Sequence, residues 1–355
     1  MEIKITRNPN PKQKPNESTL VFGETFTDHM FVMDYNKEKG WHNPQILPYG
    51  NIELDPASMI LHYGQEVFEG MKAYRSPEGK ILLFRPEKNF ERLNVSNDRL
   101  CIPQLDEKFC LQALTELLKL DKDWVPHLPG TSLYIRPFII ATQKSLGVHP
   151  AKEYKFIIIC CPVGSYYKEG LNPVKIYVEN EYVRAVKGGT GFIKSGGNYA
   201  ASLKGQEKAE KMNYSQVLWL DGRERKYIEE VGAMNVFFKI NGKVITPSLE
   251  GSILPGITRR STIELLESWN IPVEERKVSI DELVSAYEDG SLEEAFGTGT
   301  AAVISPIGEF FYKNQVMVVN NGKIGQLSQM IYDELTGIQW GKVKDNFGWS
   351  KILDI

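Results

Sequence analysis

The sequence contains no long hydrophobic run and no excess of charge of one sign. Its longest apolar run, Phe156–Val163, is too short to cross a lipid bilayer. The formal net charge of −3 over 355 residues gives no electrostatic reason for binding to nucleic acid or to an anionic membrane. We therefore expect small-molecule partners, with no nucleic-acid partner and no membrane partner.

Cysteine and histidine are scarce, and neither follows a metal-binding pattern. The chain has four cysteines and five histidines, without a CxxC or an HExxH motif, so no metal site is expected. Cys160 and Cys161 are adjacent within the apolar run, and we expect all four thiols to be buried and reduced. The N-terminal residues also lack an apolar signal segment, so a cytoplasmic location is predicted.

Composition and length predict a globular protein of about two domains, taking about 150 residues per domain. Hydrophobic residues make up 42% of the chain and charged residues 25%, as in ordinary globular proteins. We expect a flexible, Pro-rich arm over 1–18, a small α+β domain over 19–163, an interdomain loop over 164–174 and a larger α/β domain over 175–355. A ligand-binding cleft is expected between the two domains.

Local patterns predict the elements of both domains. In the first, the sequence favours strands and helices in the order strand 81–84, helix 86–100, helix 107–120, strand 131–142 and strand 154–163. In the second, strands are expected at 174–180, 215–221 and 234–240, a strand–turn–strand at 293–307, and helices at 200–212, 256–269, 280–289 and 325–339.

The stretch "GGTGFIKSGGNYAAS", residues 188–202, surrounds one lysine with glycines. A P-loop requires Gly before the lysine, but Ile193 stands there, and the dinucleotide fingerprint also fails because Lys194 replaces its last Gly. A solvated loop lysine is one interpretation. The other is a reactive amine that holds a carbonyl covalently, with the glycines leaving room for a flat cofactor.

A cofactor such as pyridoxal phosphate would require an acidic partner for its ring nitrogen and an anion site for its phosphate. Glu230 ends a β-rich segment and is the acidic candidate, although the segment alone favours a solvated Glu at a strand end. A helix start at Gly256-Ile257-Thr258 and a turn in "FGTGTAA" (296–302), which presents Thr298 and Thr300, are anion candidates. Arg92 could complete such a site or could be a surface helical arginine.

Several segments, taken in chain order, resemble the branched-chain-amino-acid aminotransferases, a group of fold-type IV pyridoxal phosphate enzymes. These are "HYGQEVFEGMKAY" (62–74), "LFRPEKNFERL" (83–93), "LYIRP" (133–137), "IKSGGNYAASL" (193–203), "EVGAMNVFF" (230–238), "LPGITRRS" (254–261) and "FGTGTAAVISPI" (296–307). The resemblance covers nearly the whole chain from about Ser18 onward. It implies a small α+β domain and a larger mixed-sheet, pseudo-barrel domain that binds the cofactor, as in D-amino-acid aminotransferase, and it implies a homodimer.

The resemblance also implies a role for each matching residue. Lys194 would bind the cofactor covalently and move the proton, Tyr199 would donate to its phenolic oxygen, and Glu230 would pair with its ring nitrogen. The residues implied for the phosphate are Arg92, Ile257, Thr258 and Thr300. Those implied for the substrate are Tyr63, Phe68, Tyr134, Arg136, Tyr166, Ala301 and Ala302.

The implied reaction is a reversible ping-pong transfer of an amino group between Leu, Ile or Val and 2-oxoglutarate, which yields branched 2-oxo acids and glutamate. The alternatives are another fold-type IV enzyme, either a D-amino-acid transaminase or a 4-amino-4-deoxychorismate lyase, and a catalytically silent binding protein. One departure from the family is visible: no CxxC redox pair follows the turn at Thr300-Ala301-Ala302.

Overall fold

The computed structural model describes residues 1–164 and 171–355 and divides into two compact units. The first contains Met1–Tyr166, Ile193–Gly196 and Gly337–Ile355, and the second contains Tyr167–Phe192 and Gly197–Thr336. This division differs from the expected domain boundaries in two places. The lysine segment 193–196 and the C-terminal segment 337–355 both belong to the first unit, although the sequence placed them in the second domain.

The first unit is built on a nine-stranded sheet in the order β1-β3-β2-β8-β7-β5-β6-β18, with β4 paired to β7. Its strands are β1 (Lys4–Ile5), β2 (His29–Asn36), β3 (Gly40–Pro48), β4 (Glu66–Phe68), β5 (Met71–Arg75), β6 (Ile81–Phe84), β7 (Ser132–Ala141), β8 (Glu153–Val163) and β18 (Ser350–Leu353). Its helices are α1 (Ile60–Tyr63), α2 (Pro86–Arg99) and α3 (Glu107–Leu120), with 3-10 turns at Glu17–Thr19 and Lys122–Trp124. The strands and helices expected from the pattern of this half are therefore confirmed to within one or two residues.

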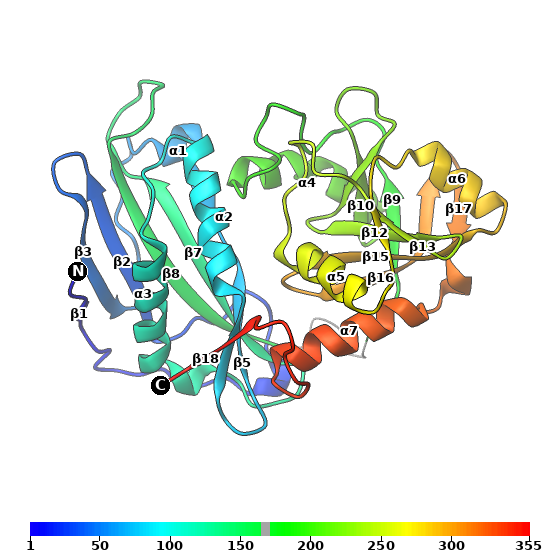
Figure 1. The fold of residues 1–355 in the computed structure, drawn as a ribbon. Helices are drawn as coiled ribbons and strands as arrows, with labels where there is room; N and C mark the ends of the chain where they lie inside the picture. The colour runs from blue at the N-terminus through cyan, green and yellow to red at the C-terminus, as the bar shows by residue number, and fades with distance from the viewer. Residues whose placement is uncertain (165–170) are drawn as a thin grey trace. The chain divides into compact units, whose positions relative to one another are not determined.

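Helices α2 and α3 pack on the first sheet, as Figure 1 shows. Asp106 begins α3 by accepting hydrogen bonds from the amides of Lys108 and Phe109. The apolar positions of α3 then recur at helical spacing, so Leu114 and Leu117 are fully buried against the strands. The same periodicity buries Phe90 and Leu93 of α2, the helix that also carries Arg92 and Ser96.

Both ends of the chain add strands to this sheet. Lys4–Ile5 pairs in parallel with β3, and the amide of Lys12 donates to Asp28 at 2.8 Å, so the arm over 1–18 has more structure than expected. At the other end, β18 pairs antiparallel with β6. The physical reason is the same at both edges, since an edge strand offers unpaired N–H and C=O groups that another segment can satisfy.

The second unit is built on another nine-stranded sheet, in the order β11-β10-β9-β16-β15-β12-β13-β14, with β17 paired to β16. Its strands are β9 (Val174–Val178), β10 (Gln216–Leu220), β11 (Ile228–Val231), β12 (Asn235–Ile240), β13 (Lys243–Thr246), β14 (Val273–Glu275), β15 (Leu292–Gly299), β16 (Val303–Tyr312) and β17 (Gln315–Val318). Its helices are α4 (Gly196–Lys211), α5 (Ile257–Ser268), α6 (Ile280–Glu288) and α7 (Gln326–Gln339), with a 3-10 turn at Asn320–Gly322. Helix α4 begins four residues before the expected start at 200.

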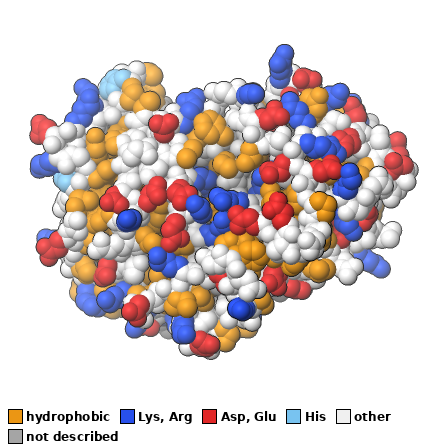
Figure 2. Space-filling model, in the orientation of Figure 1, with side chains coloured by type: hydrophobic (Ala, Val, Ile, Leu, Met, Phe, Trp, Pro, Cys, Tyr) orange, Lys and Arg blue, Asp and Glu red, His pale blue; other side chains and the backbone are white. Residues whose placement is uncertain are grey.

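The second sheet is mixed, which confirms the expected sheet type. β9 lies parallel to both β10 and β16, whereas β12 is antiparallel to β13 and to β15. Within the described residues no helix is long and apolar enough to cross a membrane. On the face drawn in Figure 2, basic and acidic side chains are interspersed, as the small net charge predicts.

Candidate active site

The backbone of Lys194 is held on both sides by the first unit. Its amide donates to the hydroxyl of Ser96 on α2 at 3.1 Å, and its carbonyl accepts from the amide of Phe68 on β4 at 3.0 Å. Its ammonium nitrogen lies 4.7 Å from the centroid of the Phe68 ring. The interpretation of Lys194 as a solvated loop lysine is therefore wrong.

The surroundings of Lys194 make its amine more reactive. Burial lowers the pKa of Lys194 to about 8, and the nearby guanidinium of Arg92 acts in the same direction. An amine with this pKa is neutral in a substantial fraction of molecules near neutral pH, and only the neutral form is a nucleophile. Burial also lowers the pKa of Lys72 to about 8, so this property alone does not single out Lys194.

The glycines around Lys194 are needed for close contacts within the protein. A β-carbon on Gly196 would lie 2.0 Å from Oε1 of Glu66, and one on Gly191 would lie 2.1 Å from the carbonyl oxygen of Ser252. Gly191 has no room for a side chain because the atom in the way belongs to the backbone, whereas at Gly196 the end of the Glu66 side chain would have to move. At Gly191, close packing of the protein against itself therefore explains the glycine.

Arg92 is buried on α2 and is fixed by a carboxylate that the sequence reasoning did not identify. Its Nε and one terminal nitrogen donate to the two oxygens of Glu69 at 2.7 and 2.9 Å. Glu69 is fully buried and also accepts from the side-chain amide of Asn89 at 2.7 Å. The alternative of a surface arginine is excluded. A buried pair of this geometry orients the guanidinium firmly.

Three of the predicted substrate residues gather around the amine of Lys194. The guanidinium carbon of Arg136 lies 4.7 Å from the centroid of the Phe68 ring, and Arg136 donates to the hydroxyl of Tyr134 at 2.9 Å. Arg136 and Tyr134 share one face of β7, as their spacing predicted. The Nε of Arg136 is buried and has no hydrogen-bond partner among the described residues, so this cluster has a donor to offer to a ligand.

One other predicted substrate residue is engaged elsewhere. Tyr63 is 40% exposed, and its hydroxyl donates to the carbonyl of Leu146. Tyr166 lies outside the described residues.

In the second unit, Glu230 lies within β11 and is buried, so the interpretation as a solvated Glu at a strand end is wrong. Its Oε2 lies 2.7 Å from Nε of Arg184, and its Oε1 accepts from the amide of Leu254 at 3.0 Å. Asn235 donates to the same oxygen at 3.4 Å. Sequence reasoning missed Arg184, and nothing local to "YVRAV" indicates its partner.

The other predicted cofactor residues of this unit lie at element ends. Helix α5 begins at Ile257, its N-cap Gly256 has no capping side chain, and Thr258 is buried in its first turn. The first amides of such a helix are open to an anion. Tyr199 lies on α4 and lines a cavity of about 270 Å³ together with Arg184.

The expected turn at 296–302 is shorter than predicted. Strand β15 continues through Gly299, so Thr298 belongs to the strand and only Thr300-Ala301-Ala302 form the turn. Val303 follows with φ of 63°, which is strained for a β-branched residue and is typical of functional sites. The hydroxyl of Thr298 is buried without a hydrogen-bond partner among the described residues.

In the part of the chain that the structure describes, no group of three or more His, Cys, Asp or Glu side chains is arranged to hold a metal ion. In the first unit the candidate residues are therefore a buried lysine, the Arg92–Glu69 pair and an aromatic wall, and in the second unit they are the Arg184–Glu230 pair and an open helix N-terminus. An amine nucleophile and anion sites of these kinds can hold a phosphorylated aldehyde and an amino acid.

Comparisons with known proteins agree with this chemistry. Residues 66–310 match the family model described as amino-transferase class IV. The chain is 60% identical over 350 residues to "Branched-chain-amino-acid aminotransferase 2" of Bacillus subtilis, covering 99% of this chain and 96% of that protein.

Solved structures of similar fold agree as well. The branched-chain amino acid aminotransferase of Escherichia coli is 28% identical, with a TM-score of 0.78 over 92% of this chain and 99% of that one. The enzyme of Thermobaculum terrenum, solved in its PLP form, has a TM-score of 0.75 and is 24% identical, over 92% of this chain and 98% of that one.

Proposed function

Because the chain belongs to amino-transferase class IV and, within it, to the branched-chain-amino-acid aminotransferases, we propose that it transfers the amino group of leucine, isoleucine or valine to 2-oxoglutarate with pyridoxal 5'-phosphate as cofactor. The observation that carries the proposal is the cluster around Lys194. Its amine, with a pKa lowered to about 8, lies beside Phe68 and is influenced by the charges of Arg92 and Arg136.

The residues present fit this cofactor. The uncapped start of α5 and the buried hydroxyl of Thr298 offer donors, and the paired Arg184 and Glu230 place a carboxylate in the interior of the second unit. Bound pyridoxal phosphate supplies an aldehyde that captures an amino group and a protonated ring that accepts electrons from the substrate.

Lys194 has two tasks in the proposed reaction. Its Nζ would hold the cofactor covalently through the aldehyde, and the same amine, once free, would move the proton between the substrate Cα and the cofactor. The contacts of its backbone with Ser96 and Phe68 keep the side chain anchored through both tasks.

The ring and the phosphate are proposed to be held by different residues. Glu230 would accept the hydrogen of the ring nitrogen and keep that nitrogen protonated, and Tyr199 would donate to the phenolic oxygen. The proposed phosphate ligands are Arg92, Ile257, Thr258 and Thr300. The pair with Glu69 limits the directions in which Arg92 can donate, so a phosphate would meet a guanidinium already in position.

The substrate is proposed to lie against an apolar wall with polar ends. Phe68 and Tyr134 supply the wall for a branched side chain, together with Tyr63 and Tyr166, and the amides of Ala301 and Ala302 bind the α-carboxylate. Glutamate carries a second carboxylate, which would be costly to bury without a partner. Arg136 is the proposed partner, because its Nε is buried and lacks a hydrogen-bond acceptor.

Two properties of the whole molecule are also proposed. The family resemblance supports a homodimer. The cytoplasm is proposed as its location, because the four cysteines are free thiols and would stay reduced there.

A panel of amino donors with 2-oxoglutarate as the acceptor tests the function. We expect glutamate formation from L-leucine, L-isoleucine and L-valine and a yellow purified protein. Activity confined to D-alanine, or consumption of an aminodeoxychorismate without an acceptor, would instead identify another fold-type IV enzyme. A colourless protein without any activity would indicate a silent binding protein.

A further inference from the structure

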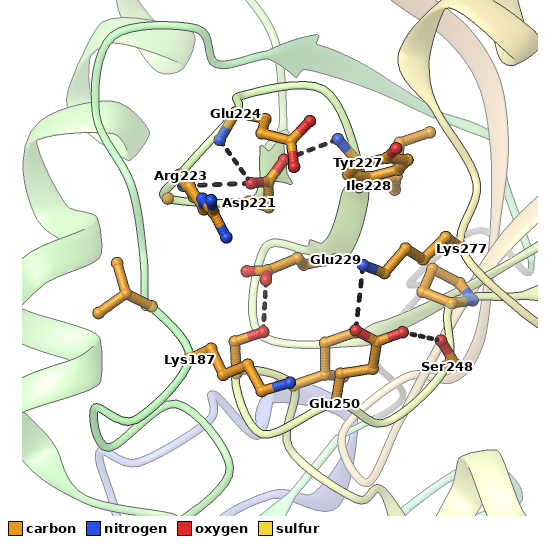
Figure 3. A pocket seen from close by; sticks show the side chains of 15 residues that line it. Lys187, Asp221, Arg223, Glu224, Tyr227, Ile228, Glu229, Ser248, Glu250 and Lys277 are labelled. Atoms are coloured by element: carbon orange, nitrogen blue, oxygen red, sulfur yellow. Dashed lines mark hydrogen bonds and ion pairs between the residues drawn. The ribbon is translucent and has the colours of Figure 1, made fainter.

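A cavity of about 450 Å³ lies in the second unit beside β11, and it contains none of the residues predicted for catalysis. It is shown in Figure 3 and is called the Glu229 pocket below. Its lining residues are Val186, Lys187, Asp221, Gly222, Arg223, Glu224, Tyr227, Ile228, Glu229, Pro247, Ser248, Glu250, Ser252, Ile253 and Lys277. Its volume is in the range of sites for small molecules.

Glu229 is the unusual group of this pocket. The side chain is only 7% exposed, and one carboxyl oxygen accepts from the hydroxyl of Ser252. The other oxygen, Oε2, is buried and has no hydrogen-bond partner among the described residues. Figure 3 shows the carboxyl between Arg223 and Lys187. A buried oxygen of this kind needs a donor, and no described residue provides it.

Two of the three other acidic side chains of the pocket, Asp221 and Glu250, have hydrogen-bond partners, and the third, Glu224, is exposed. The two oxygens of Asp221 accept from four backbone amides, those of residues 223, 224, 226 and 227, at 2.7 to 3.1 Å. Glu250 accepts from Lys277 at 3.2 Å and from the hydroxyl of Ser248 at 3.1 Å. Glu229 is therefore the one buried carboxyl group among the lining residues, and its Oε2 lacks a donor among the described residues.

Exposed basic side chains lie at the rim of the pocket. Lys187 and Arg223 are exposed and bring two positive charges to the lining, against one exposed carboxylate, that of Glu224, since Glu250 pairs with Lys277. The lining also includes the apolar residues Val186, Ile228 and Ile253. A ligand that satisfies all three parts has an ammonium, an anionic group and an apolar body.

We propose that the Glu229 pocket binds a zwitterionic amino acid with an apolar side chain, whose ammonium donates to Oε2 of Glu229 and whose carboxylate faces Lys187 and Arg223. Such a ligand satisfies the buried oxygen and balances the rim charges at once. The cavity has room for a molecule of the size of leucine.

Ser252 connects this pocket to a residue pair of the proposed active site. Its hydroxyl donates to Glu229, and its carbonyl accepts from Arg184 at 3.1 Å. Arg184 in turn pairs with Glu230 at 2.7 Å. A ligand in the pocket would therefore change the hydrogen bonding of Ser252 and, through it, of Arg184, the partner of Glu230.

The test is calorimetric titration of the holoenzyme after borohydride reduction, which fixes the cofactor and prevents turnover. Three probes separate the contributions of the ammonium and the carboxylate to the binding affinity. They are L-leucine, isopentylamine, which lacks the carboxylate, and 4-methylpentanoate, which lacks the ammonium. We expect leucine to bind most tightly and 4-methylpentanoate most weakly. In Glu229→Gln, leucine should bind at least about tenfold more weakly, whereas Glu250→Gln, a rim carboxylate already paired with Lys277, should retain wild-type binding.

The pH dependence gives an independent readout. Burial raises the pKa of Glu229 to about 7, and Glu230 and Asp221 act in the same direction, whereas Ser252 and Arg184 oppose it. The ionised carboxylate therefore increases from pH 6 to pH 8, and leucine should bind more tightly across this range in the wild type but not in Glu229→Gln.

Equal leucine affinity in wild type and Glu229→Gln would overturn the proposal, as would the absence of leucine binding. If Glu229→Gln fails to fold, the exposed double variant Lys187→Met/Arg223→Met decides, because wild-type leucine affinity in that variant would likewise overturn the proposal.

Discussion

The guanidinium Nε of Arg184 lies 2.7 Å from Oε2 of Glu230, and both side chains are buried in the second unit. Glu230 thus has a positive partner independently of any cofactor. Removing one member of such a pair leaves the other charge buried and unpaired, which costs about 3–5 kcal/mol of stability. Catalytic and structural effects at Glu230 must therefore be separated.

Glu230→Gln should lose most turnover, because a neutral amide cannot hold the cofactor ring nitrogen protonated; the effect on the barrier should be on the order of several kcal/mol. The same variant should unfold at a lower temperature, since Arg184 loses its partner. The double variant Glu230→Gln/Arg184→Met removes both charges and should recover stability but not turnover. Steady-state rates and calorimetric unfolding measure the two effects, and wild-type turnover in Glu230→Gln would refute the assigned role.

Lys194→Ala should abolish both the yellow colour and the amino transfer. Lys72→Met is the matched control, because burial lowers the pKa of Lys72 to about 8 as well. Lys72→Met should keep the colour even if it folds less stably. Borohydride reduction followed by peptide mapping should find the cofactor on Lys194, and a label on Lys72 would reverse the assignment.

The rate at which apoprotein binds pyridoxal phosphate covalently should depend on pH through Lys194. The pKa of Lys194 is lowered to about 8, so the neutral, nucleophilic amine increases from pH 6 and approaches saturation above pH 8. An ordinary lysine would continue to gain reactivity up to its usual pKa near 10.5. Stopped-flow absorbance measures this rate, and a rate still rising steeply at pH 9.5 would contradict the lowered pKa.

Arg136→Met should slow the half-reaction of glutamate far more than that of leucine. The reason is that only glutamate brings a second carboxylate to the buried Nε of Arg136. Arg75→Met serves as the control, since Arg75 binds the backbone carbonyls of Val125 and Lys122 on the same unit. Single turnovers followed by cofactor absorbance separate the half-reactions, and equal losses in both would leave Arg136 with a structural role.

One thiol should react rapidly with an aromatic disulfide reagent, and activity should survive. The expectation that all four cysteines are buried is wrong for Cys101, which is exposed. Cys110, Cys160 and Cys161 are buried, and burial raises the pKa of each of these three thiols, so they react slowly. Cys101→Ser should remove the fast phase. A fast loss of activity in that variant would contradict this distribution of reactivity.

Local structure followed from local pattern. The apolar spacing over 107–120 predicted α3, and the β-branched runs predicted β7 and β8, because a helix or a buried strand repeats its environment every few residues. The motifs around Lys194 and Glu230 also indicated the chemistry, because an amine nucleophile and an acidic partner can be recognised from residue type alone. The sequence by itself therefore determined most of the elements and the family, and it singled out Lys194 as the candidate for the reacting lysine.

The partners of those groups were decided only by tertiary structure. Glu69 lies 23 positions from Arg92, and Arg184 lies 46 from Glu230; no periodicity links residues at such separations. The same holds for β18, which returns from the end of the chain to pair with β6. A carboxylate in the sequence carries no sign of whether it will be buried. Burial, and with it the choice of partner, arises only when distant segments pack together and exclude water from the charge.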